Sequence, residues 1–208
     1  MDYILIGNSG HARVIRDCIE ASGDRIFAIL DDKDAIPSMD GDIFRGPLSE
    51  VGRLLEIDHR RVILAYSDNG VRKQLVDYLK LPDEKYGIVI HPKAVVSHYS
   101  EIGAGSVVLP GAVVNSGAVI GKHCILNSQS VVEHESLLQD YVHVSTGASI
   151  TREVVVETGA SLGANSTIIP NRKIGEWSIV GAGSAVIADL PPGCTAVGCP
   201  AKILEKEG

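Results

Sequence analysis

The sequence predicts a small Rossmann-like α/β domain followed by a parallel β-helix built from hexapeptide repeats. Two observations indicate this division. In the first part of the 208 residues, short apolar runs alternate with amphipathic segments, whereas from Ile90 onward every sixth residue is aliphatic. We therefore expect the α/β domain at 1–89, the β-helix at 90–189 and a C-terminal cap at 190–208.

The repeat of six residues is the strongest pattern in the chain. Seventeen successive positions from Ile90 to Val186 are aliphatic, and Ala, Ser or Cys stands four residues after thirteen of the first sixteen. A period of six fits neither an alternating strand nor an amphipathic helix. Three hexads, each with one short strand and a corner, would close a triangular coil with the aliphatic side chains inside. Glycines that follow the aliphatic residue are expected to allow tight corners: Gly103, Gly121, Gly163, Gly175 and Gly181.

The first part of the chain is typical of a parallel sheet with right-handed helical crossovers. Runs of branched aliphatic residues predict buried strands, and the amphipathic segments between them predict helices. After residue 189, two prolines and a glycine precede a segment for which we expect a short helix that folds back as a cap. The predicted strands are 3–7, 25–31, 61–66 and 86–90, and the predicted helices are 11–23, 47–57 and 69–80.

Composition and charge argue against several classes of protein. The formal net charge of −7 does not suit a general nucleic-acid or anionic-membrane binder. No apolar run approaches the length of a membrane span, and the first residues lack the basic segment of a signal peptide, so we expect a cytoplasmic protein. Four scattered cysteines without a CxxC pair indicate neither a disulfide framework nor a zinc site: Cys18, Cys124, Cys194 and Cys199.

The first predicted β–α turn, residues 7–11 (GNSGH), is a candidate binding element. Glycines at such a point let the backbone approach a phosphate at a helix N-terminus, although a plain tight turn is equally compatible with them. Asp31 and Asp32 end the second predicted strand, where a doubly wound sheet places residues that bind a nucleoside hydroxyl or base edge. A solvated acidic loop is the alternative for this pair.

His134 is the strongest candidate for chemistry in the repeats. It lies at a corner of the coil between Glu133 and Glu135, while Val132 and Ser136 fill the interior, so we expect its imidazole to face outward. A neighbouring carboxylate can fix the tautomer of a histidine and raise its basicity, as a general base requires. Four other histidines are expected to be ordinary surface residues: His59, His91, His98 and His123.

The spacing of the histidines argues against a metal site and in favour of an oligomer. His98 and His134 occupy the same hexad place two coils apart, about 10 Å, which is too far to share a zinc ion. His143 lies nine residues after His134, and Asn127 lies seven residues before His134. Half a coil puts the two histidines on different faces, so we expect a symmetric oligomer to collect His134 from one subunit and His143 from the next.

Several motifs resemble the PglD- and NeuD-like family of bacterial sugar acyltransferases. They are NSQSVVEHESLLQDYVHVSTGA (127–148), the IIPN and GAGS hexads and the closing GCPAK, together with GNSGHARVI, LDD and SDNGVR in the first part. The resemblance covers essentially the whole chain. It implies a left-handed β-helix, a homotrimer with active sites between adjacent coils, and transfer of an acetyl group from acetyl-CoA to a UDP-linked amino sugar of the 4-amino type.

The resemblance also implies roles for individual residues. His134 matches the general base, Glu135 its orienting partner, and Asn127 an acceptor-binding residue. One segment departs from the family pattern, because Thr151-Arg152-Glu153 stands where a Gly-Asn pair is common, and Arg152 could instead contact a CoA phosphate. The nucleotide-sugar pocket is matched by Gly7, Gly10, His11, Asp31, Asp32, Asn69 and Arg72, and the acetyl-CoA site by His143, Arg152, Gly163, Gly181 and Lys202.

Direct transfer suits these residues. A thioester is already activated, so the enzyme needs to hold an amine, remove a proton and stabilise an oxyanion, to which His143 or a backbone N–H could donate. Cys124 falls at an inward place and is not expected to act as a nucleophile. The acidic pair at 31–32 slightly favours an amino sugar. O-acetylation of sialic acid or a related sugar is the alternative within enzymes, and a solenoid scaffold is the alternative outside them.

Overall fold

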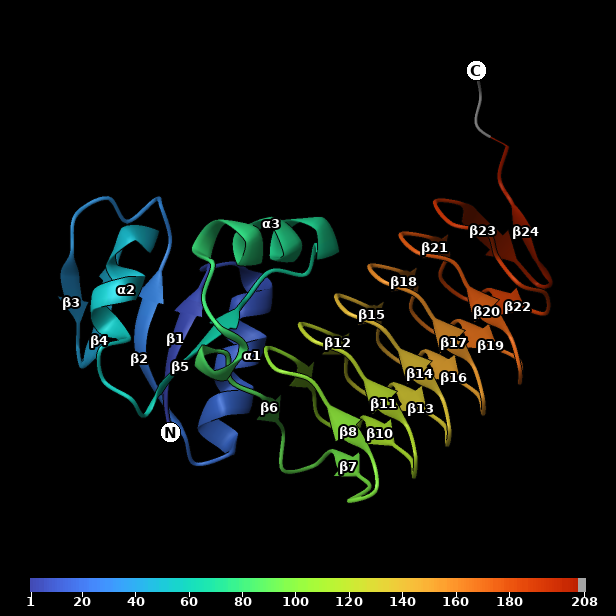
Figure 1. Ribbon diagram of the computed structural model, residues 1–208, viewed down its shortest axis with the longest axis horizontal. Coiled ribbons are helices and arrows are strands. Elements are labelled where there is room, and N and C mark those ends of the chain that lie inside the picture. Colours follow the sequence, from blue (N-terminus) through green and yellow to red (C-terminus); the bar gives the residue numbers. More distant parts are fainter. Residues whose placement is uncertain (206–208) are drawn as a thin grey trace.

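The computed structural model describes residues 1–205 and shows an α/β part joined to a long β-helix (Figure 1). The α/β part holds a five-stranded sheet in the order β3-β4-β2-β1-β5, parallel except for the edge strand β3. The hairpin of β3 and β4 was not predicted, because β3 is exposed throughout and offers no apolar run. The strands are β1 (Asp2–Ile6), β2 (Arg25–Leu30), β3 (Ser38–Asp40), β4 (Ile43–Gly46) and β5 (Arg60–Leu64).

Two of the predicted helices are confirmed as α1 (Gly10–Ala21) and α3 (Asn69–Leu79). Each begins after a side chain that accepts a backbone N–H: Ser9 caps α1, and Asp68 caps α3 at 2.8 Å from the nitrogen of Val71. The helix predicted at 47–57 is shorter, because a 3₁₀ turn (Leu48–Glu50) leads into the single turn of α2 (Val51–Leu54). None of the helices in residues 1–205 combines the length and hydrophobicity needed to cross a membrane.

The strand predicted at 86–90 divides between the two parts of the molecule. After a 3₁₀ turn (Asp83–Lys85), Tyr86 forms only an isolated bridge with Val62 of the α/β sheet. Val89–Ile90 then forms β6, which pairs with the β-helix instead. Ile15 and Ile19 of α1 pack in one core cluster with apolar residues of the first coils, so the two parts share a core.

The β-helix has three faces, each a parallel sheet, and each strand pairs with the strand one coil further along. This confirms the hexapeptide coil. We number the faces in the order in which the chain enters them. The first face holds β6, β9 (Val107–Val108), β12 (Ile125–Leu126), β15 (His143–Val144), β18 (Ser161–Leu162) and β21 (Ile179–Val180); the second holds β7 (Val95–Val96), β10 (Val113–Val114), β13 (Val131–Val132), β16 (Ser149–Ile150), β19 (Thr167–Ile168) and β22 (Ala185–Val186); the third holds β8 (Glu101–Ile102), β11 (Val119–Ile120), β14 (Leu137–Leu138), β17 (Val155–Val156) and β20 (Lys173–Ile174).

The aliphatic positions of the hexads fill the interior of the coil, as predicted. Every one of them from Val108 to Val186 is buried. Ile90, Val96 and Ile102 remain partly exposed, because the first coil has a neighbouring coil on one side only. The interior is therefore a stack of branched side chains, and most of the small residues four places later are buried with it.

The glycines that follow the aliphatic positions do not have the predicted role. The left-handed conformation recurs instead at every sixth residue from Gly105 to Gly183, with φ between 54° and 77°. The glycines of the predicted set are needed for close approach between coils. A Cβ on Gly163 would lie 2.5 Å from the backbone nitrogen of Ala182, and one on Gly103 would lie 2.6 Å from the backbone of Gly121.

The segment after the last hexad forms strands, so the predicted short helix is wrong for the described residues. β23 (Thr195–Gly198) pairs in parallel with β21 and extends the first face by one strand. β24 (Ala201–Ile203) returns antiparallel beside it. The hairpin covers the end of the coil, as a cap would, and the last three residues of the predicted cap lie outside the described residues.

Candidate active site

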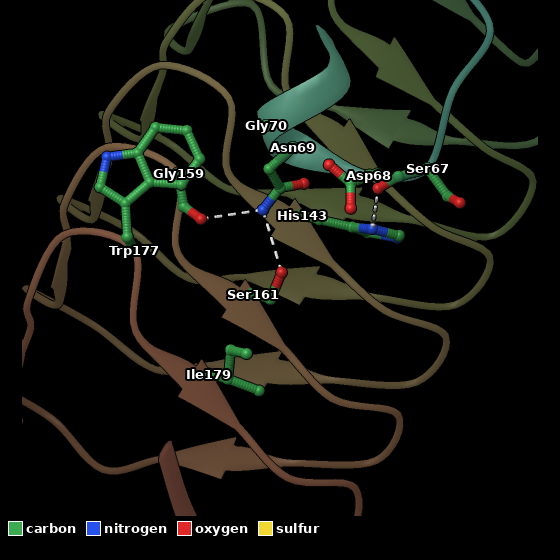
Figure 2. Close-up of a pocket in the computed structure, with 9 residues that line it drawn as sticks. All are labelled: Ser67, Asp68, Asn69, Gly70, His143, Gly159, Ser161, Trp177 and Ile179. Carbon is green, nitrogen blue, oxygen red and sulfur yellow. Dashed lines mark hydrogen bonds between the residues drawn. The ribbon is translucent and has the colours of Figure 1, made fainter. Parts of the chain in front are cut away.

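A pocket of about 520 Å³ lies where the first turn of α3 meets the first face of the β-helix (Figure 2). The residues at the start of α3 form one wall, and three neighbouring coils supply the other. We call it the α3 pocket. His143, Ser161 and Ile179 are outward residues of β15, β18 and β21, and they form a column because each strand pairs with the next coil. The lining residues are Ser67, Asp68, Asn69, Gly70, His143, Gly159, Ser161, Trp177 and Ile179.

Asn69 fastens α3 to the first face. Its side-chain nitrogen donates to the carbonyl oxygens of Gly159 and Ala160, at 2.9 and 3.2 Å, and to Ser161 Oγ at 2.9 Å. Its side-chain oxygen accepts from Arg72 Nη2 at 2.8 Å. Asn69 is buried, and both ends of its amide are engaged within the protein, so it fixes the wall of the pocket.

Arg72 lies behind this wall, at the junction of the two parts, with an exposure of 1%. All five of its N–H groups are used inside the chain, so the expected direct contact with a nucleotide sugar does not fit this arrangement. Burial lowers the pKa of Arg72 to about 10. Its acceptors are the carbonyl oxygens of Tyr66 (3.0 Å), Ser67 (3.0 Å), His123 (2.9 Å) and Tyr141 (3.0 Å) and Oδ1 of Asn69 (2.8 Å).

His143 projects from β15 toward the residues before α3 (Figure 2). Its Nδ1 lies 3.1 Å from the carbonyl oxygen of Ser67, and because a carbonyl only accepts, Nδ1 carries a proton. Burial, followed by the positive charge of Arg72, lowers the pKa of His143 to about 4. The ring is therefore neutral at pH 7, and the buried Nε2 is a hydrogen-bond acceptor. The expected donation from His143 to an oxyanion does not fit this state.

The turn between β1 and α1 lies close to the α3 pocket. The ring of His11 has its centroid 6.4 Å from that of His143, and burial lowers the pKa of His11. Gly7 has φ of 107°, and a Cβ there would lie 2.7 Å from the ring of Tyr66. Gly10 begins α1. The structure therefore brings the predicted turn and His143 together.

The acidic pair shapes the loops at the carboxyl edge of the sheet. Asp31 accepts from the backbone nitrogens of Asn8 and Lys33, both at 3.1 Å, and Asp32 accepts from that of Leu48 at 3.1 Å. Asp32 also lines a second pocket of about 270 Å³ along α3. Its walls are mostly apolar, and its residues are Asp32, Leu48, Val71, Gln74, Leu75 and Tyr78.

His134 faces outward from the corner between β13 and β14, as predicted, while Val132 and Ser136 are buried. Glu135 is in the left-handed conformation, and its carboxylate lies over Gly117 of the preceding coil. Within residues 1–205, no hydrogen bond joins His134 to a glutamate. The expected pairing of His134 with Glu135 is therefore not formed within the single chain.

His134 and His143 lie at opposite sides of the coil, as the half-coil spacing predicted. His143 belongs to the first face, whereas His134 stands at the corner between the second and third faces. That corner is the one opposite the first face of a triangular coil. One chain therefore presents the two predicted groups in opposite directions.

The architecture matches two family models, the PglD N-terminal domain over residues 2–79 and the bacterial transferase hexapeptide (six repeats) over residues 99–134. A variant of perosamine N-acetyltransferase from Caulobacter crescentus, solved in complex with CoA and GDP-perosamine, is 31% identical with a TM-score of 0.90. That match covers 99% of this chain and 98% of the other. The chain belongs to the PglD-like sugar acyltransferases.

Two further relatives agree with this placement. The acetyltransferase domain of PglB from Neisseria gonorrhoeae FA1090, solved with acetyl coenzyme A, is 28% identical with a TM-score of 0.83 and 98% coverage of both chains. UDP-N-acetylbacillosamine N-acetyltransferase from Bacillus subtilis (strain 168) is 42% identical over 109 residues, which is 50% of each chain. The match thus spans half the length of this curated relative. The full-length likenesses confirm the predicted α/β domain followed by a left-handed β-helix.

Three of the residues that the PglD-like resemblance assigns to substrates share one corner of the coil. Asn127, Gly163 and Gly181 each follow a strand of the first face, so they lie in a row beside the column of His143. The side-chain oxygen of Asn127 accepts from the backbone nitrogen of Ser128 at 2.8 Å. This row borders the first face but does not line the α3 pocket.

Arg152 and Lys202 of this PglD-like chain lie away from the α3 pocket. Arg152 lies at the same corner of the triangular coil as His134, one coil further along the chain. It pairs with Glu153 at 3.1 Å. Lys202 is exposed on β24. Among residues 1–205, no group of three or more His, Cys, Asp or Glu side chains could hold a metal ion.

The sequence did not single out four residues of the α3 pocket: Gly159, Ser161, Trp177 and Ile179. The register contains a signal for two of them, because Ser161 and Ile179 follow His143 at intervals of three hexads. Trp177 is 37% exposed and left-handed, with φ of 54°. Its indole covers Gly159, where any Cβ would collide with the ring.

The expectation that His123 is a surface residue is wrong in this PglD-like fold. This residue is only 2% exposed, because the α/β part covers its corner of the coil. Its ring stacks on Tyr141 at 5.4 Å and meets the edge of Tyr86 at 4.6 Å. Burial lowers the pKa of His123 to about 4. Cys124 faces inward as predicted, and burial raises the pKa of its thiol to about 12.

Proposed function

We propose that this PglD-like acyltransferase moves the acetyl group of acetyl-CoA to the amino group of a UDP-linked amino sugar by direct attack. The observation that carries the proposal is the α3 pocket, which is lined by residues of both the α/β part and the β-helix. Relatives of nearly the same length were solved with CoA and GDP-perosamine and with acetyl coenzyme A. Both substrate classes therefore suit a site at this junction.

The first face suits the pantetheine arm of acetyl-CoA. An extended arm laid along the column would start at His143 and pass Ser161 and Ile179, with the indole of Trp177 as an apolar wall. The row of Asn127, Gly163 and Gly181 would border it. Arg152 would meet a phosphate of CoA held at the corner of a neighbouring chain.

The α/β part suits the nucleotide sugar. The N-terminus of α1 and the turn at 7–11 offer backbone N–H groups to a diphosphate. The mostly apolar pocket beside Asp32 has room for a nucleobase, and the carboxylate can accept from a base edge or a ribose hydroxyl. The sugar would then extend toward His11 and His143.

Transfer would proceed with His134 of a neighbouring chain as the general base. The amine nitrogen attacks the thioester carbon, a C–N bond forms, and the carbonyl electrons move to oxygen. His134 takes the proton from nitrogen and returns it to the CoA sulfur as the C–S bond breaks. Because Nε2 of His143 is an acceptor, a backbone N–H is the better candidate donor to the oxyanion.

A homotrimer would complete this site. In a closed three-fold assembly with coils side by side, the corner of His134 in one subunit meets the first face of the next. The carboxylate of Glu135, which forms no hydrogen bond or ion pair within residues 1–205, would then be available to orient His134. The active sites would lie between subunits.

The base of the nucleotide has two candidates. The Bacillus relative favours UDP, because its name specifies a UDP sugar. That match covers half of each chain. GDP is favoured by the Caulobacter relative, which was solved with GDP-perosamine and matches over nearly the whole length. The proposal keeps the UDP-linked 4-amino sugar as the first choice.

The direct test is to mix the purified protein with acetyl-CoA and UDP- or GDP-linked amino sugars and follow release of free thiol. Mass spectrometry of the product would distinguish an N-acetyl from an O-acetyl group. Rapid N-acetylation of a UDP-amino sugar is the expected result. Turnover of only the GDP sugars, or of only sialic acids, would overturn the UDP assignment or the amine assignment respectively.

Complementation would test whether the site is shared between subunits. His134→Ala and His143→Gln are each expected to be inactive alone. When the two variants are co-expressed and assemble at random, about a quarter of the sites combine both native histidines in a trimeric arrangement. Recovery of about that fraction supports the shared site, and complete inactivity of the mixture contradicts it.

A further inference from the structure

Arg72 and His143 bind the same atom. The carbonyl oxygen of Ser67 accepts from Arg72 Nη1 at 3.0 Å and from His143 Nδ1 at 3.1 Å. A carbonyl oxygen has two lone pairs, so it can serve both donors at once. Arg72 holds that carbonyl in place from behind the wall of the α3 pocket.

Arg72 is held in a fixed orientation, because all of its N–H groups form hydrogen bonds within the protein. Two of its bonds go to the segment before α3, and two go to carbonyls of the β-helix, at His123 and Tyr141. A planar guanidinium can satisfy several acceptors in fixed directions, whereas a lysine ammonium is a single flexible point charge. The position of the Ser67 carbonyl relative to the first face therefore depends on this side chain.

The charged groups around His143 favour a neutral ring. Burial lowers the pKa of His143 most, and Arg72 from α3 lowers it further. The hydrogen bond to the Ser67 carbonyl raises the pKa, and His11 from α1 makes a smaller lowering contribution. Asp68 also lines the pocket, but its carboxylate accepts from the backbone nitrogen of Val71 at 2.8 Å. Within residues 1–205, no carboxylate forms an ion pair with Arg72, and its positive charge lowers the pKa of both His143 and His11.

We propose that Arg72 is a positioning residue for His143: through the Ser67 carbonyl it fixes the Nδ1–H tautomer and presents Nε2 as an acceptor to an N–H group of a bound substrate. The tautomer follows from the chain alone, whereas the identity of the N–H group rests on the proposed function. Two sources fit, an amide N–H of the pantetheine arm and the amine of the sugar. Both are N–H donors of the size that the α3 pocket admits.

Nitrogen-15 NMR of histidine-labelled protein tests the tautomer without any activity measurement. His143→Gln would assign the signal. At pH 7 the wild-type ring should show a protonated Nδ1 and an unprotonated Nε2, and it should remain neutral down to about pH 5. An Nε2–H tautomer, or a positively charged ring near pH 7, would overturn the proposal even if the enzyme proved fully active on amino sugars.

Variants of Arg72 test the positioning role. Arg72→Met should mix the tautomers of His143 and raise its pKa, while Lys73→Met, a change at a half-exposed residue on the same helix, should do neither. If Arg72→Met does not fold, Arg72→Lys provides the answer. This variant keeps the positive charge but loses the planar guanidinium that binds several carbonyls at once, so it should disturb the single tautomer of His143. It should also lower kcat by up to about 100-fold, with a smaller change in the KM for acetyl-CoA. Unchanged tautomer and kcat in Arg72→Lys would contradict the role.

Titration with CoA alone, and then with the amino sugar alone, separates the two sources of the N–H group. A shift of the Nε2 signal with CoA identifies the pantetheine amide as the donor to Nε2, and a shift only with the sugar identifies the amine as that donor. Absence of a shift with both ligands at saturating concentration would overturn the acceptor role.

Discussion

Asn69 and Ser161 lie 92 residues apart in the sequence and are joined by a hydrogen bond of 2.9 Å between Nδ2 and Oγ. Together with the bonds from Asn69 to two neighbouring carbonyls, this contact fixes the α/β part on β18, the middle one of the three strands that line the α3 pocket. The relative position of the α/β part and the β-helix therefore depends on a few buried polar groups.

We expect Asn69→Ala to lower the free energy of unfolding by about 1–3 kcal/mol, because it leaves the buried Gly159 carbonyl and one N–H of Arg72 without the partner that Asn69 provides. The KM for acetyl-CoA should rise as the wall of the pocket loosens. Urea unfolding and steady-state kinetics measure the two effects. Lys73→Ala is the matched control on the same helix, since the Lys73 side chain is half exposed and, within residues 1–205, pairs only with Asp77. Equal stability of Asn69→Ala and the wild type would show that this docking contact is dispensable.

His134→Ala should reduce kcat by about 10²- to 10⁴-fold, the usual contribution of a general base, with binding of CoA retained. Thiol release and calorimetry with CoA provide the two measurements. His98→Ala is the control, because His98 occupies the same corner two coils away and is also exposed. A rate in His134→Ala close to that of His98→Ala would exclude the base role.

Trp177→Ala should weaken binding of acetyl-CoA by about 5- to 30-fold, because an aromatic wall of the α3 pocket contributes about 1–2 kcal/mol. Trp177→Phe should restore most of the affinity, since it keeps an apolar ring over Gly159. Calorimetric titration checks both. The exposed aromatic Tyr99 lies on the first coils, far along the chain from this pocket, and Tyr99→Ala should bind normally. Unaltered affinity in Trp177→Ala would remove Trp177 from the site.

The two kinds of glycine in the coil should respond differently to substitution. Gly163→Ala places a Cβ 2.5 Å from the backbone of the next coil and should severely destabilise the β-helix. Gly183→Ala meets no atom within 4 Å and should cost only about 1–2 kcal/mol for its left-handed backbone. Gly183→Asn should cost less, because Asn165 and Asn171 already adopt this conformation. Thermal unfolding would rank the three, and a mild effect of Gly163→Ala would contradict the close-approach explanation.

Stability should fall as the pH decreases from 6.5 toward 4. His123 and His143 have a pKa of about 4 in the folded chain and 6.5 as free side chains, so in this range unfolding takes up protons. Their contribution is complete above pH 6.5 and is lost as the pH approaches 4. Urea unfolding at several pH values gives the number of protons taken up. His123→Gln should reduce it by about one near pH 5, and an unchanged number would show that His123 is not held neutral by folding.

The repeat could be predicted almost completely, because it is local. Each hexad sets its own strand, its corner and the burial of its aliphatic residue, as Val132, His134 and Ser136 illustrate. The outward position of His134 and its separation from His143 follow from counting residues. The end of the chain and the short helix α2 were harder, because brief segments adopt whichever structure their neighbours allow.

Local residue patterns specify the three-sided coil, the α/β domain before it and the direction of each side chain in the coil, since these depend on residues close together in the chain. The corner that the α/β domain covers depends instead on packing between distant segments. That packing buries His123, turns Arg72 from an expected ligand contact into an internal support, and makes His143 an acceptor. No periodic pattern encodes these outcomes, because they arise where two independently patterned parts meet and must satisfy each other's buried polar groups.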